Sequence, residues 1–125
     1  MGVERWRGVL LDPENEAWVV ETGEPAGFIC LTPPPDYVPQ ARSFLDQIYL
    51  LPSWQSGGMG SGIWRHLMED LRRRRALPLA LAAVEVNDRA RIFYEGHGGH
   101  AIDLILGFTW QGRPFYEIVY LFDST

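Results

Sequence analysis

Apolar side chains recur along the chain with two different periods, which predict a mixture of strands and helices. Short apolar runs at residues 17–21 and 26–31 flank the turn-forming residues 22–25, and this arrangement predicts a β-hairpin. Prolines 33–35 cannot continue a strand because proline lacks a backbone donor and has a fixed φ. Residues 32–43 are therefore predicted to form a loop.

The middle of the chain alternates between the two periods. Residues 44–51 predict a third strand, and a glycine-rich turn follows it. Ile63, Leu67 and Leu71 then recur at helical spacing. This helix is predicted to close at residues 72–75, where four arginines complement the carbonyl end of the helix dipole.

The second half of the chain continues with strand, helix and hairpin. Residues 79–86 are almost all apolar, which is typical of a strand buried on both faces and predicts parallel pairing with residues 44–51. Asn87 is a natural N-cap for a short helix over residues 88–96. A final hairpin is predicted from two further apolar runs, residues 101–109 and 115–122.

The order hairpin, strand, helix, strand, helix, hairpin predicts a mixed α/β fold. We expect a central twisted sheet with antiparallel hairpins at both ends and a parallel pair in the middle. Residues 3–11 are mixed in character and are predicted to be the last turns of a helix. The length of 125 residues fits a single domain over residues 1–125.

Composition excludes several classes of protein. The chain has 11 basic and 16 acidic residues and a net charge of −5, which disfavours a nucleic-acid partner. No apolar run approaches the roughly 20 residues that span a bilayer, and no signal-peptide core is present, so a cytoplasmic protein without a membrane partner is expected. The single cysteine, Cys30, excludes an internal disulfide, and the three histidines lack metal-ligand spacing, so no metal site is predicted.

The segment from Ile48 to Gly62 carries the most informative chemistry. A strand enters a loop with four glycines between positions 57 and 62, and the loop opens a helix. Unpaired N–H groups and the helix dipole make such a turn an anion site, and a phosphate or pyrophosphate is the expected anion. A P-loop is excluded because the segment has no lysine, and a dinucleotide fingerprint is excluded because Ile63 stands where its third glycine is needed.

Two motifs at the expected distance resemble the GNAT acetyltransferases. The first is Gln55-x-x-Gly58-x-Gly60, which is similar to the acetyl-CoA loop of that family. The second runs over residues 87–95 and is similar to the family pattern Asn-x-x-Ala-x-x-Phe-Tyr-Glu, with a glycine-bearing turn after it. The resemblance covers residues 14–122 and implies a GNAT-like fold. It also implies transfer of an acetyl group from acetyl-CoA to a primary amine.

The resemblance also implies roles for individual residues. The pyrophosphate would be held by the glycine-rich turn, whose matching positions are Gln55, Gly57, Gly58, Met59, Gly60, Ser61 and Gly62. The pantetheine arm would run along Leu50 and Leu51, where the middle strands should splay apart at residues 50–52, and would bond to Asn87. Ala90 and Phe93 would line the thiol end. Tyr94 would be the general acid that protonates the departing thiolate.

The base that accepts the proton of the amine has two candidates. Asp46 lies early in the third strand, and Glu85 is the single charge of the apolar run 79–86. A water chain without a dedicated base is the third possibility. The acceptor itself is undetermined: a polyamine or other small amine, an aminoglycoside and a lysine-rich peptide all suit the acidic balance.

The chain departs from the family at its N-terminus. The family fold begins with a strand and two helices, whereas about 16 residues precede the first hairpin here, so the first strand and helix are predicted to be reduced or missing. An uncovered sheet edge and the final strands then favour a homodimer. Two alternatives to an acetyltransferase remain. One is a CoA-binding or truncated module without catalysis, and the other is a phosphate-loop binder of nucleotides such as ATP.

Overall fold

The computed structural model describes residues 2–7, 14–21, 25–50 and 59–123, and these residues form seven strands and two helices. The chain order of these elements is β1 (Gly2–Arg7), β2 (Glu16–Glu21), β3 (Pro25–Thr32), β4 (Ser43–Leu50), α1 (Met59–Arg73), β5 (Leu79–Val84), α2 (Asp88–Gly96), β6 (His100–Trp110) and β7 (Arg113–Phe122).

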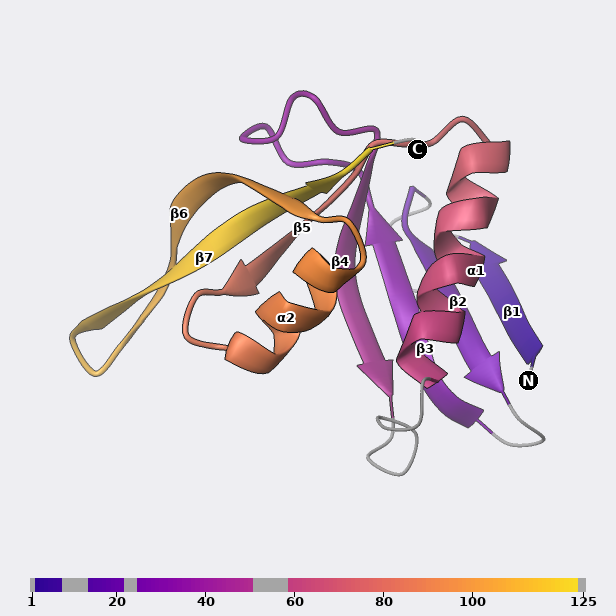
Figure 1. Cartoon of the computed structure of the whole chain (residues 1–125), viewed down its shortest axis with the longest axis horizontal. Helices are drawn as coiled ribbons and strands as arrows, with labels where there is room; N and C mark the ends of the chain where they lie inside the picture. The colour runs from indigo at the N-terminus through magenta and orange to yellow at the C-terminus, as the bar shows by residue number, and fades with distance from the viewer. Residues whose placement is uncertain (1, 8–13, 22–24, 51–58, 124–125) are drawn as a thin grey trace.

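The strands form one sheet in the order β1-β2-β3-β4-β5-β7-β6 (Figure 1). Strands β4 and β5 are parallel, and every other neighbouring pair is antiparallel. The predicted mixed α/β fold is confirmed, with its hairpins at both ends and its parallel pair in the middle. Neither of the two helices in the described ranges is long and apolar enough to cross a bilayer.

The parallel pair separates almost as soon as it forms. Only Ser43 with Leu79 and Phe44 with Ala80 are in register, although β4 continues to Leu50 and β5 to Val84. Figure 1 shows the two strands diverging from this common start. The predicted opening at residues 50–52 therefore begins much earlier, directly after Phe44.

A β-bulge in β4 accompanies this separation. Leu45 lies opposite Leu31 and Gln47 opposite Cys30, which leaves Asp46 as an extra residue in β4. A bulge bends its strand and increases the local twist. The bulge also lets Leu45 and Ile48 contact the same core although they are three residues apart.

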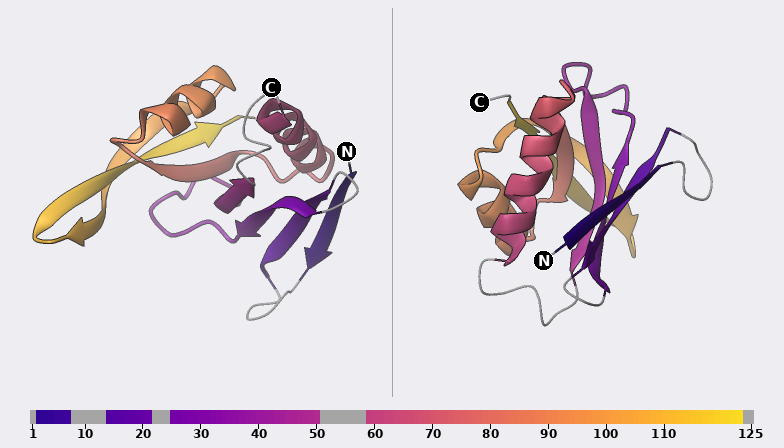
Figure 2. Two further views of the ribbon diagram at one scale, coloured as in Figure 1. Left: turned by 90° about the horizontal axis from the view of Figure 1, so that it is seen from below. Right: turned by 90° about the vertical axis from the view of Figure 1, so that its right-hand side faces the viewer.

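Both helices pack on one face of the sheet (Figure 2). The predicted helical spacing is confirmed, because Ile63, Leu67 and Leu71 of α1 are buried against the sheet. A second buried cluster lies on the opposite face, where Val38 of the 33–42 loop packs against strand residues. Its strand members are Phe44, Ala80, Val119 and Leu121.

The N-terminal prediction is wrong in its element type. Residues 2–7 form the edge strand β1, antiparallel to β2 with Val3 opposite Val20 and Trp6 opposite Ala17, and not the end of a helix. The first strand of the sheet is therefore present. Pairing with β2 gives this short segment a ladder of hydrogen bonds between the strands. An isolated helical turn is unfavourable by comparison, because helix nucleation is costly. Only residues 8–15 separate β1 from β2, fewer than two helices would need.

Candidate functional site

α1 follows β4 in the chain, and its first turn is the described part of the predicted anion site. Met59, Gly60, Ser61 and Gly62 begin α1, so their backbone N–H groups belong to the helix end that has no intrahelical acceptors. Leu50 ends β4. The other predicted loop positions, Leu51, Gln55, Gly57 and Gly58, lie outside the described residues. The described part of the predicted anion site is therefore the N-terminus of α1.

α2 begins with the cap that the sequence predicts. The Asn87 side-chain oxygen accepts a hydrogen bond from the backbone N–H of Ala90 at 3.2 Å, and the helix spans Asp88–Gly96, which confirms the predicted bounds. The amide N–H₂ of Asn87 is not used by this cap, and the side chain is exposed. Asn87 can therefore cap its helix and still donate to a ligand.

Tyr94 lies where α2 meets α1 and the sheet. Its ring contacts Trp64 of α1 and Tyr120 of β7, with centroids 5.8 and 6.1 Å apart. Burial raises the pKa of the Tyr94 phenol above its ordinary value. The hydroxyl therefore carries its proton throughout the neutral range, as a proton donor must.

Two contacts hold α2, and Tyr94 with it, against the sheet. The hydroxyl of Tyr120 donates to Glu95 Oε2 at 2.5 Å. Beyond the helix, the backbone at Gly99 lies so close to the sheet that an added Cβ would sit 2.6 Å from the Phe122 ring. The N–H of Gly99 donates to the carbonyl of Tyr94 at 2.9 Å. These contacts fix the C-terminal end of α2, and the position of Tyr94 with it.

Trp64 joins the two helices. It is 2% exposed, and its ring contacts those of Phe93, Tyr94, His97 and Phe122. Its indole Nε1–H is buried and has no hydrogen-bond partner among the described residues. Phe93, predicted to line the thiol end, packs in this aromatic cluster. Ala90 is half-buried one turn earlier on α2.

His97 contacts the site, and sequence reasoning missed it. Its Nδ1 lies 2.8 Å from the carbonyl oxygen of Phe93, and its Nε2 lies 3.0 Å from Ser61 Oγ in the first turn of α1. In the sequence His97 stands in a glycine-rich turn that follows the second motif, and nothing within that turn signals its contact with Ser61. The described residues contain no group of three or more side chains that could hold a metal ion.

Asp46 is exposed at the β4 bulge. The pKa of the Cys30 thiol is raised by burial first and then by the Asp46 carboxylate. The pKa of the Tyr37 phenol is raised by burial first, then by Glu117 and Asp46. Asp46, Tyr37 and Glu117 are therefore electrostatic neighbours, although they come from β4, the 33–42 loop and β7.

Glu117 was not singled out by the sequence. Its carboxylate lies over Gly107 of β6, where an added Cβ would be 2.7 Å from Glu117 Oε1. A glycine within a strand often marks the close approach of another group, and this signal was available in the sequence.

The expectation that Glu85 is a lone charge within the apolar strand is wrong. β5 ends at Val84, and Glu85 is exposed beyond it, with its N–H donating to the Tyr116 carbonyl at 2.8 Å. The apolar run therefore does not bury a charge, and Glu85 pays no desolvation cost that a function would have to offset. Its assignment as a base stays a prediction without that support.

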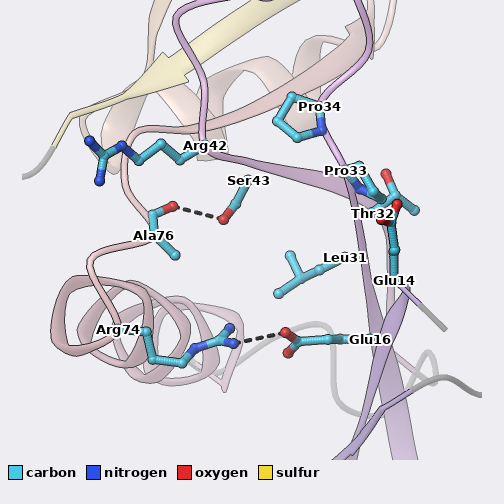
Figure 3. Close-up of a pocket in the computed structure, with 10 residues that line it drawn as sticks. All are labelled: Glu14, Glu16, Leu31, Thr32, Pro33, Pro34, Arg42, Ser43, Arg74 and Ala76. Atoms are coloured by element: carbon cyan, nitrogen blue, oxygen red, sulfur yellow. Dashed lines mark hydrogen bonds and ion pairs between the residues drawn. The ribbon is translucent and has the colours of Figure 1, made fainter.

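A cavity of about 320 Å³ lies at the opposite end of the α1–sheet interface (Figure 3). Arg74 Nη1 lies 2.7 Å from Glu16 Oε1, and Ser43 Oγ donates to the Ala76 carbonyl at 2.7 Å across it. These contacts tie the end of α1 to β2 and β4. None of the predicted site residues lines this cavity among the described residues.

The comparisons with known proteins agree with this geometry. The sequence model of the Acetyltransferase (GNAT) family matches residues 2–98. No curated protein matches the chain. Among solved structures, an acetyltransferase of the GNAT family from Elizabethkingia anophelis, with acetyl-CoA bound, is 12% identical with a TM-score of 0.78. The similarity covers 98% of this chain and 97% of that one.

Two further solved structures share the fold. The ribosomal-protein alanine N-acetyltransferase from Escherichia coli is 19% identical, with a TM-score of 0.75 over 92% of this chain and 72% of that one. A spermidine N-acetyltransferase chimera that includes the Vibrio cholerae enzyme is 17% identical, with a TM-score of 0.73. That similarity covers 89% of this chain and 68% of the chimera.

Proposed function

Because the chain belongs to the GNAT acetyltransferase family, we propose that it transfers the acetyl group of acetyl-CoA to a primary amine. The observation that carries the proposal is the separation of β4 from β5 after Phe44, together with the contact of Tyr94 with Trp64 of α1. Strand edges without a partner offer backbone groups to an extended amide-bearing arm such as pantetheine. Acetyl-CoA supplies a thioester that a neutral amine attacks directly.

The residues of the chain would bind the cosubstrate and move one proton. Backbone N–H groups of Met59 to Gly62, together with the loop before them, would bind the diphosphate at the N-terminus of α1. Asn87 would donate to the pantetheine arm. The Tyr94 hydroxyl would give its proton to the leaving thiolate, whose conjugate acid has an ordinary pKa near 8.5.

The acceptor that we propose is a cationic amine. Asp46 and Glu117 are electrostatic neighbours at Tyr37, and the chain carries a net charge of −5. Two carboxylates attract a polycation and disfavour an anionic acceptor. Asp46 is the preferred candidate for the base, and Glu117 is a second one. That one of the structurally similar proteins is a spermidine N-acetyltransferase agrees with this choice.

The first test is thermal unfolding with acetyl-CoA, CoA or ATP. A ligand at about 100 times its dissociation constant stabilises the folded state by about 2.7 kcal/mol, which raises the melting temperature by several degrees. We expect this increase with acetyl-CoA and CoA and none with ATP. Absence of an increase with either CoA compound would contradict the proposal, and an increase with ATP alone would favour a nucleotide binder.

A CoA-binding module without catalysis is the second candidate function. The observation that favours it is the short stretch between β1 and β2, since two helices of the family fold are expected there. Release of free thiol from acetyl-CoA separates the two candidates. An enzyme should release thiol with spermidine or a lysine-rich peptide, whereas a binding module should bind acetyl-CoA without turnover.

We further propose that two copies of the chain associate through β6. This strand is the edge of the sheet, and it exposes four large apolar side chains. They are Leu104, Leu106, Phe108 and Trp110. An exposed apolar edge strand is a template for pairing with another chain. Sedimentation at tens of micromolar should give the mass of a dimer, and a monomer there would contradict this proposal.

A further inference from the structure

His97 connects the end of α2 to the first turn of α1 through both of its ring nitrogens. Nδ1 lies 2.8 Å from the Phe93 carbonyl oxygen, and Nε2 lies 3.0 Å from Ser61 Oγ. A carbonyl oxygen only accepts hydrogen bonds, so Nδ1 carries a proton in both charge states of the ring. Gain or loss of a proton by His97 therefore takes place at Nε2, the nitrogen that contacts Ser61.

The charge state of His97 decides what the Ser61 hydroxyl can do. When the ring is neutral, Nε2 accepts the hydroxyl proton, and Ser61 can offer only lone pairs to a third group. When the ring is protonated, Nε2–H donates to Ser61 Oγ, and the hydroxyl proton is released to donate elsewhere. Only the second arrangement suits an anion at this helix N-terminus, and it also brings a positive charge close to the anion.

We propose that His97 is a positioning residue for the diphosphate of the cosubstrate and that it acts through Ser61. The protein binds the diphosphate most tightly when His97 is protonated. The inference rests on the proposed function, since the diphosphate is that of acetyl-CoA. Binding of the diphosphate is then linked to uptake of a proton. The affinity for the diphosphate should therefore fall as the pH rises through the range in which imidazoles titrate.

The surroundings of the ring contain charges of both signs. A cavity of about 320 Å³ beside His97 is lined by Arg65, Glu69 and Arg72 of α1, of which the arginines oppose and the glutamate favours protonation. The rings of Phe93 and Trp64, 4.3 and 6.2 Å away, can stabilise a cation.

The carboxylate of α2 closest to His97 along the chain is engaged elsewhere. Glu95, the carboxylate of α2 nearest to His97 in sequence, accepts from Tyr120 of β7. Because two arginines face one glutamate beside the ring, the charges of the protein do not favour protonation, and an arriving diphosphate is the group that shifts the balance toward the protonated ring.

The test is the pH dependence of binding of 3′-dephospho-acetyl-CoA, measured by calorimetry. This ligand is chosen because a phosphate monoester titrates near pH 6, whereas a diphosphate linkage does not. We expect binding to be at least about fivefold tighter at about pH 6 than at about pH 8. Titrations in buffers of different ionisation enthalpy should show net uptake of protons.

Two variants and one shortened ligand identify the groups. His97→Gln keeps a hydrogen-bonding group without titration near neutrality, and its affinity should vary less than about twofold over the same pH range. Ser61→Ala should reduce the pH effect because the hydroxyl is gone. Acetyl-pantetheine, which has no diphosphate, should bind the wild-type protein equally at both pH values.

The outcomes separate the inference from the proposed function. Wild-type binding that is equally tight at both pH values would overturn the role of His97 and leave the proposed function intact. An undiminished pH effect in Ser61→Ala would overturn the role of the hydroxyl. Failure of the wild-type protein to bind either acetyl-CoA or its dephospho form at any pH would overturn both.

Discussion

Replacement of Tyr94 by Phe should lower kcat by about a hundredfold or more, because general acid catalysis typically contributes 10²–10⁴-fold. The substitution removes one hydroxyl and keeps the ring, so the contacts with Trp64 and Tyr120 remain. The affinity for acetyl-CoA should therefore change little. Initial rates of thiol release at saturating acetyl-CoA, combined with calorimetric dissociation constants, measure the two effects separately.

Tyr116→Phe is the matched control for this prediction. Tyr116 is an exposed tyrosine of β7, 42% accessible, and its substitution also removes a single hydroxyl. We expect its kcat to stay within about twofold of the wild type, since surface substitutions usually have small effects. A Tyr94→Phe enzyme as fast as this control would show that Tyr94 is not the acid and that water or another group protonates the thiolate.

Because Tyr94 is buried, it should contribute no pH dependence to the wild-type rate near neutrality. Burial raises the pKa of its phenol above the ordinary value of about 10. The acid is therefore fully protonated at neutral pH, and it is lost only as the pH rises through that raised pKa. Any fall in rate between about pH 6 and pH 9 must come from other groups, such as the acceptor amine.

The sequence predicts those parts of the fold that local pattern determines. Ile63, Leu67 and Leu71 predict α1 because a helix returns the same face to the core every three to four residues. Asn87 predicts the start of α2 because its side chain satisfies a backbone N–H of the first turn. In both cases the cause lies within one element.

The features that were missed depend on contacts between elements. β1 is a strand because β2 lies beside it, and nothing within residues 2–7 alone favours a strand over a helical turn. The bulge at Asp46 arises because Leu45 and Ile48 must both reach the core under α1. Glu85 is exposed because β5 ends one residue earlier, which a run of apolar letters does not reveal.

The residues of the candidate site can be divided by the same criterion, namely whether the signal lies within one element or in contacts between elements. Tyr94 is a candidate through the resemblance of residues 87–95 to a family motif, and these residues lie almost entirely within one element, α2. His97 and Glu117 were not predicted, because their partners Ser61 and Gly107 come from other elements. A sequence motif identifies residues that lie within one element, whereas contacts between elements can be identified only in the folded structure.

Replacement of Trp64 by Ala should destabilise the protein by about 3–5 kcal/mol, the usual cost of removing a buried aromatic ring. Trp64 is 2% exposed and contacts rings of α2 and β7, so its loss opens a cavity between both helices and the sheet. The melting temperature should fall by more than about 10 °C. Ile92→Ala is the control: Ile92 is 73% exposed on α2, and its truncation should cost at most about 0.5 kcal/mol.

Trp64→Phe tests a second aspect of the same residue. The smaller ring keeps part of the aromatic packing and removes the indole Nε1–H, which is buried without a partner among the described residues. A buried donor without a partner costs about 1–3 kcal/mol, so its removal should offset part of the lost packing. Urea unfolding should therefore give Trp64→Phe a much smaller loss than Trp64→Ala. If both variants lose the same stability, removal of the indole N–H offsets nothing, and this N–H is hydrogen-bonded in solution.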